Sequence, residues 1–191
     1  GPYLSVRLAG KPMPYPIFLG YAVSRDGGKS WDCDFSEPAF KPGFNFNPES
    51  PALITDAFGR EMFNYANGAA EDPRLFYFED ELYLSTACRP FPPGPYWDHD
   101  DPLQCMPAGF DSFGPAVAQN YTVTMLYKVD LEALKRRDYA NSFEFITPLH
   151  EPDVSDNRDV VLMPRRINIG GKSKIVCIHR PKWPWHYEIG K

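Results

Sequence analysis

Short runs in which apolar and polar residues alternate recur along the chain, and this pattern predicts β-strands. Residues 17–24 are rich in aromatic and branched side chains and precede Asp26-Gly27, a dipeptide that favours a hairpin turn. We therefore expect a return strand that opens at Ser30. The same pattern predicts further strands at residues 60–66, 75–78, 82–87, 121–129, 160–163 and 174–179.

Only one short segment, residues 131–138, has the pattern of a helix, so the regular alternation of a parallel α/β fold is not expected. The 21 prolines and 14 glycines also argue against a helix bundle, because an interior proline removes a helix hydrogen bond. Short strands at regular spacing predict an all-β fold: a sandwich, a barrel or a propeller. Weak similarity between residues 21–26 and 126–131 favours the propeller. Since a blade takes roughly 40–50 residues, the chain would hold about four blades at most.

The length of 191 residues predicts one domain, and 43% hydrophobic with 15% aromatic residues excludes a disordered chain. Residues 89–114 are rich in proline and predict a long loop. Long ordered loops in compact domains are often functional lids, although a surface insertion is an equal alternative.

A net charge of −5 argues against a nucleic-acid partner, which usually requires a basic face. No run approaches the ~20 apolar residues of a membrane span, and no signal peptide is visible, so we expect no membrane partner. The four cysteines include no CxxC pair, which argues against a metal site and favours free thiols and a cytoplasmic location. The chain opens with Gly1-Pro2, so we expect the natural N-terminus to lie upstream.

Adjacent carboxylates at Glu71 and Asp72 stand before Pro73, and they are the first candidates for chemistry. The proline disfavours the right-handed helical region for Asp72 and predicts extended or turn geometry. Neighbouring side chains on a strand point to opposite faces, so the two carboxylates should not form a dyad. Taken alone, an acidic turn before a strand is more often structural than catalytic. Basic residues in 156–167 and 178–181 could bind an anion at strand ends.

Three motifs follow one another along the chain: GAAEDPR at residues 68–74, NRDVVLMP at 157–164 and HRP at 179–181. Together they resemble glycoside hydrolase family 130, the mannoside phosphorylases and related β-mannosidases. The resemblance implies a single catalytic domain over residues 1–191, a five-bladed β-propeller with a central pocket. It also implies an incomplete ring, with an opening element before this sequence and a closing blade after it. Residues 3–9 and 21–31 are similar to earlier strands of the family.

The resemblance also assigns roles. Asp72 matches the catalytic aspartate of the family, and Arg158 stands where the phosphorylases have a phosphate-binding lysine. The match at Arg89 is looser, because the long predicted loop begins there. By the same resemblance, Arg89, Arg158 and His179 bind phosphate, Arg7 and Asn67 bind sugar, and Arg136 or Arg137 adds a further cation.

The chemistry separates two reactions. Inverting hydrolysis needs a second carboxylate roughly 6.5–9.5 Å away to activate water, whereas phosphate is already an anionic nucleophile and needs only cations to hold it. Arg89 and Arg158 therefore favour a phosphorylase that converts a β-mannoside to mannose 1-phosphate with inversion, with inorganic phosphate as co-substrate and no cofactor. The alternatives are an inverting β-mannosidase, with Asp156 or Asp159 as second carboxylate, and a non-catalytic propeller that binds other proteins. The expected partners are an oligosaccharide and phosphate, and a homo-oligomer is left open.

Overall fold

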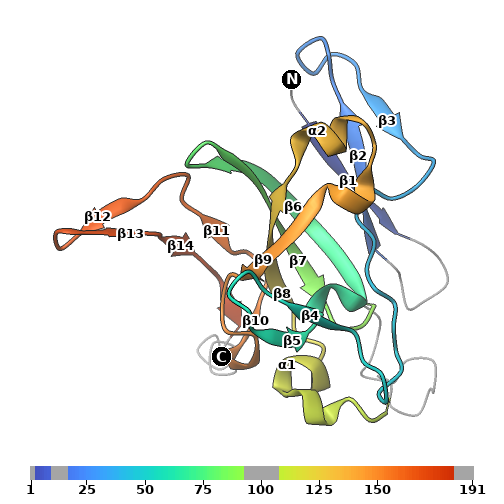
Figure 1. Ribbon diagram of the computed structural model, residues 1–191, viewed down its shortest axis with the longest axis vertical. Coiled ribbons are helices and arrows are strands. Elements are labelled where there is room, and N and C mark those ends of the chain that lie inside the picture. The colour runs from blue at the N-terminus through green and yellow to red at the C-terminus, as the bar shows by residue number, and fades with distance from the viewer. Residues whose placement is uncertain (1–2, 10–16, 93–107, 183–191) are drawn as a thin grey trace, which may run out of the picture.

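The computed structural model describes residues 3–9, 17–92 and 108–182. Its centre is a seven-stranded sheet in the order β1-β2-β6-β7-β8-β9, with β3 paired to β2 (Figure 1). The contact between β2 and β6 is parallel and joins Ile17 to Ala69, while the other pairs are antiparallel. The strands are β1 (Tyr3–Ala9), β2 (Ile17–Val23), β3 (Asp32–Asp34), β6 (Ala69–Phe78), β7 (Glu81–Arg89), β8 (Val123–Val129) and β9 (Phe143–Pro148).

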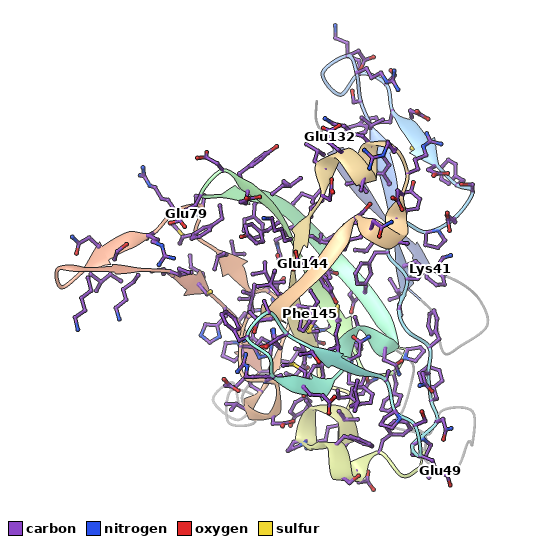
Figure 2. All side chains as sticks on the ribbon, viewed as in Figure 1. Lys41, Glu49, Glu79, Glu132, Glu144 and Phe145 are labelled. Carbon is purple, nitrogen blue, oxygen red and sulfur yellow. The ribbon has the colours of Figure 1, made fainter. Side chains whose placement is uncertain are left out.

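Four smaller antiparallel pairs surround this sheet. Three of them, all within residues 156–182, form an arm that extends away from the central sheet (Figure 1). Arg166 of the arm donates a hydrogen bond of 2.8 Å to Glu79, which is labelled in Figure 2. The pairs are β4 (Leu53–Thr55) with β5 (Glu61–Phe63), β10 (Asp156–Asn157) with β15 (Pro181–Lys182), β11 (Val161–Leu162) with β14 (Cys177–Ile178), and β12 (Ile167–Ile169) with β13 (Lys172–Lys174).

Helices are short and lie between the strands. The longest, α2, begins after Asp130, whose side chain accepts from the Ala133 backbone N–H and so satisfies one end of the helix. Over the described residues, no helix has the length and apolar character needed to cross a membrane. The helices are α1 (Pro115–Ala118), α2 (Leu131–Lys135) and the 3-10 helices η1 (Tyr65–Asn67), η2 (Asp111–Phe113), η3 (Tyr139–Asn141) and η4 (Pro152–Val154).

Aromatic side chains fill the core beside the central sheet. Phe91 and Phe110 are each 1% exposed, and their rings meet edge to face with centroids 5.1 Å apart. Phe63 on β5 contacts both rings. Edge-to-face packing favours such aromatic pairs beyond the area that they bury. This cluster fixes the residues that precede β6 and follow β7.

The prediction of an all-β fold is confirmed, because strands far exceed helices. The strand predicted at residues 60–66 is only half right: β5 ends at Phe63, and η1 follows because the Asn64 side chain accepts from the Ala66 N–H. The helix α1 was not predicted. Much of the predicted loop at 89–114 lies outside the described residues, although Arg89 itself closes β7.

The strands β6, β7, β8 and β9 form an antiparallel meander in chain order. A four-stranded antiparallel sheet is the unit from which propeller blades are built. The meander is therefore compatible with one blade, while the closed ring and the number of blades stay predictions.

Candidate active site

A β-bulge interrupts the pairing of β6 with β7 at the predicted catalytic residue. Glu71 lies opposite Ala87 and Arg74 opposite Ser85, so the two residues between them on β6 face a single residue of β7. That residue, Thr86, donates its hydroxyl to the Glu71 carbonyl at 2.8 Å. Bulges bend a strand and change the direction of a side chain, and they occur often beside active sites.

Asp72 occupies this bulge with a φ of 51° and an exposed side chain. The sequence predicted extended or turn geometry; the bulge instead places the residue in the left-handed region, which aspartate tolerates better than most residues. Glu71 is 6% exposed, so the two carboxylates face different environments, as expected for neighbours on a strand.

Two predicted phosphate-binding arginines come together beside the bulge. The Arg89 Nε atom lies 3.6 Å from Glu71 Oε1, and its Nη1 donates to the Asn120 carbonyl at 2.9 Å. Burial lowers the pKa of Arg89, and the charge of nearby Arg158 lowers it further. The Nε atoms of both arginines are buried without a hydrogen-bond partner in the structure. An anion between the two side chains would offset the repulsion between their charges.

The third predicted phosphate ligand, His179, is exposed, and it contacts the residue next to Arg158. Its Nδ1 atom is 2.9 Å from the side-chain amide of Asn157, the fully buried residue that precedes Arg158. A second histidine, His150, lies nearby, and its Nε2 accepts from the Thr124 N–H at 3.2 Å. Burial lowers the pKa of His150, and His179 adds to this effect.

Sequence reasoning did not place His150 or Asn120 at this site, because no pattern in the sequence links either residue to Arg89 or His179. Asn120 has a φ of 50°, and it contributes its carbonyl to Arg89 and its side-chain oxygen to the Phe91 N–H at 3.0 Å. A left-handed asparagine cannot be recognised from its neighbours in the sequence.

The two candidate second carboxylates are both engaged with cations. Burial acts to raise the pKa of Asp156, but hydrogen bonds from Lys182, at 3.0 Å, and from Thr122 outweigh it, so the pKa is lowered. The hydrogen bond from Arg74 holds the pKa of Asp159 below its ordinary value. Asp159 also accepts from Arg180, with an N···O distance of 2.6 Å.

Asn67 and Arg7 are the predicted sugar-binding residues. Asn67 is fully buried, its amide donates to the carbonyls of Asn45 and Pro90 at 2.9 and 3.1 Å, and its oxygen accepts from the Asn45 N–H. The Asn67 side chain thus anchors a loop in this structure, and its role in binding sugar stays a prediction. Arg7 lies on β1 opposite Leu19, and its side chain lies outside the described residues.

The further cation predicted at Arg136 or Arg137 is not directed to this site through Arg137. That side chain donates to Asp32 on β3 at 3.1 Å and so is engaged with the β2–β3 hairpin.

Two of the cavities in the described part of the chain are the following. One of about 590 Å³ is bordered by Glu132 and Glu144, which Figure 2 labels, and the other, of about 330 Å³, by Lys41 and Phe143. Neither of these two cavities is lined by Asp72, Arg89 or Arg158.

Comparisons of the chain with protein-family models, with curated proteins and with solved structures found no match. Within the described parts of the chain, no group of three or more histidine, cysteine or acidic residues is placed to hold a metal ion.

Proposed function

We propose that this chain belongs to an inverting glycoside phosphorylase that cleaves a β-mannoside with inorganic phosphate, on a five-bladed β-propeller. Asp72 is the proton donor, and Arg89 and Arg158, assisted by His179, hold the phosphate. The proposal rests on the sequence resemblance, and it extends the all-β architecture to a closed ring.

One observation carries the proposal: two neighbouring arginines, distant in the sequence, have buried Nε atoms that make no hydrogen bond in the structure, and Arg89 Nε has only the Glu71 carboxylate at 3.6 Å. Buried donors are normally satisfied, so an unpaired set suggests a ligand that would pair with them. The planar fork of arginine suits phosphate, because it can donate to two oxygens at once.

In the proposed reaction the arginines hold the nucleophile and Asp72 protonates the leaving group. Phosphate held by the arginines attacks the anomeric carbon from the face opposite the leaving group, and the carbon–oxygen bond of the glycoside breaks. Asp72, which must be protonated in the complex, gives its proton to the departing oxygen, directly or through a mannose hydroxyl. The products are mannose 1-phosphate with inverted configuration and the acceptor sugar. Holding phosphate in line supplies much of the rate enhancement.

The test is turnover of a β-mannoside by the purified protein, with and without phosphate, followed by phosphorus NMR. We expect mannose 1-phosphate only when phosphate is added. Arg158→Ala should raise the phosphate concentration required for half-maximal rate more than the mannoside concentration.

Equal turnover in phosphate-free buffer would favour the β-mannosidase instead. The engagement of Asp156 and Asp159 with cations argues against either as the base for water. A non-catalytic interaction module would bind neither phosphate nor mannose in a calorimetric titration.

A further inference from the structure

We propose that Glu71 makes the anion site selective for phosphate over sulfate. The inference rests on the proposed function, because it assumes that Arg89 and Arg158 bind an anion. It assigns a specificity-determining role to a residue adjacent to the proton donor.

Glu71 is held close to the cations that would bind the anion. Its side chain is 8% exposed and that of Arg89 is 13% exposed, with 3.6 Å between Oε1 and Nε. The backbone of Glu71 is fixed by its pairing with Ala87 and by the Thr86 hydroxyl. The carboxylate therefore cannot withdraw far from an anion on Arg89 without disturbing the start of the bulge.

The charge balance of the site also limits what it can bind. Glu71 and Asp156 both act on the charge of Arg89, and Asp159 lies close enough to Arg158 to feel its charge, so the two arginines already face carboxylates. A carboxylate repels an incoming anion unless the anion supplies a proton that the two can share. Phosphate at neutral pH retains at least one proton, whereas sulfate retains none.

A phosphate hydroxyl can therefore donate to Glu71 while its other oxygens accept from Arg89 and Arg158. Hydrogen bonds from a hydroxyl to a carboxylate are short and strong, and more so where water is excluded. Sulfate has the same shape and can bind the same arginines, but its oxygens would face the carboxylate with no proton between them. The selectivity thus comes from a repulsive element against the wrong ligand.

The experiment is a calorimetric titration of the whole protein with phosphate and sulfate at neutral pH. Hydrogen bonds to charged groups predict that the wild-type protein prefers phosphate by about tenfold to a hundredfold. In Glu71→Gln, which keeps the shape but removes the charge, this preference should fall to roughly threefold or less through tighter sulfate binding.

Asp159→Asn is the matched control, because it removes a carboxylate that pairs with Arg74 and Arg180 in the same basic region. It should change the affinities for phosphate and sulfate by the same factor and leave their ratio as in the wild type. A ratio in Glu71→Gln equal to that of the wild type would overturn the role of Glu71 alone. Wild-type protein that binds neither anion would overturn the phosphate site and, with it, the proposed phosphorolysis.

A second measurement needs no variant. Arsenate retains a proton at neutral pH and selenate does not, so the wild-type protein should prefer arsenate over selenate as it prefers phosphate over sulfate. Equal affinity for the two members of either pair would overturn the inference even if Glu71→Gln failed to fold.

Discussion

Asp72 joins an exposed carboxylate to a left-handed backbone, with a φ of 51°. A residue with a side chain pays roughly 1–2 kcal/mol to adopt this region. Such strain persists where the surrounding structure enforces it, and it is concentrated at functional sites. Here the bulge enforces it, because Asp72 and Pro73 together face a single residue of β7. The backbone is thus a second reason, independent of the motif, to place chemistry at this residue.

Replacement of Asp72 by glycine should make the folded protein more stable while it lowers the rate of phosphorolysis. The relieved strain, about 1–2 kcal/mol, exceeds the entropy that a glycine adds to the unfolded chain, about 0.5–1 kcal/mol. We expect Asp72→Gly to raise the free energy of unfolding by about 0.5–1 kcal/mol in urea denaturation, and to lower phosphorolysis at least a hundredfold, since a positioned acid contributes roughly that much.

Asp80→Gly is the control for this prediction, because Asp80 has a φ of 69° in the turn between β6 and β7. It should gain similar stability with unchanged activity. If Asp72→Gly is less stable than the wild type, or retains its activity, the assignment of Asp72 is wrong.

Asp34 gives a pH dependence of stability away from the site. It is 5% exposed, and hydrogen bonds from Ser36 and then from the Tyr139 hydroxyl lower the pKa of Asp34 to about 2, from 3.8. Since the folded state holds the proton less tightly, the stabilisation is complete above pH 4 and is lost as the pH falls towards 2.

The comparison of wild type with Asp34→Asn tests this. The wild type should be more stable at neutral pH by about 1–3 kcal/mol, because the Tyr139 hydroxyl loses a charged acceptor in the variant. Acid denaturation series should show this advantage shrinking between pH 4 and pH 2. A difference that stays constant over this range would contradict the assigned role.

At the scale of elements, patterning predicts the strands whose neighbours in the sheet are also close in sequence. The alternation in residues 121–129 predicts β8. The dipeptide Gly170-Gly171 indicates a turn, and it joins β12 to β13 in the structure. The 3-10 helix η1 could not be predicted, because it depends on the Asn64 side chain accepting from the Ala66 N–H.

At the candidate site, too, the sequence predicted some features, while others depend on tertiary packing. The order of the motifs suggested that Arg89 and Arg158 act together, and the structure brings them close. The burial of Asn67 could not be foreseen, because it follows from where the loop at Asn45 packs. Likewise, the contact of Arg89 with the Asn120 carbonyl depends on a backbone turn that no pattern marks.

Gly68 controls how β6 begins, and it gives the next prediction. A Cβ atom there would lie 2.1 Å from the carbonyl carbon of Phe91 and 2.4 Å from the nitrogen of Pro92, both backbone atoms that cannot move aside. Overpacking of this kind costs at least 1–3 kcal/mol, so Gly68→Ala should lower the free energy of unfolding by roughly 3 kcal/mol. Because β6 would shift with the loop, activity should fall as well.

The control is Gly170→Ala, at a turn with a φ of 59° and no atom within 4 Å of the added carbon. It should lose only the left-handed cost of about 1 kcal/mol. Chemical denaturation measures the free energy of unfolding of both variants. Equal losses of this free energy would show that the close approach of Phe91 and Pro92 to Gly68 is unimportant.

At the scale of the whole molecule, the chain divides into a packed sheet and a thin arm. Residues such as Leu84, Val123 and Met125 are almost completely buried in the sheet. In residues 161–182, all of which the structure describes, only Leu162 is buried. Isolated two-stranded hairpins are marginal in water, so the arm contributes little to its own stability. The proposed anion site lies where β10, at the base of the arm, meets the residue before β8 through the hydrogen bond from the Asn157 N–H to the Thr122 carbonyl.

This division predicts two levels of protection in native-state hydrogen exchange. Amides of β7 and β8 should exchange only through global unfolding, while those of β12 and β13 should exchange through local opening with protection at least a hundredfold lower, a difference of about 2.7 kcal/mol.

Phosphate should raise protection at Asn157 and Arg158, because a ligand that binds the folded state opposes local opening of its site. Ile169 and Ile178, both exposed on the arm, should be unaffected by phosphate. Equal protection of arm and sheet would mean that another surface covers the arm, and protection by phosphate confined to the arm tip would place the anion away from the bulge.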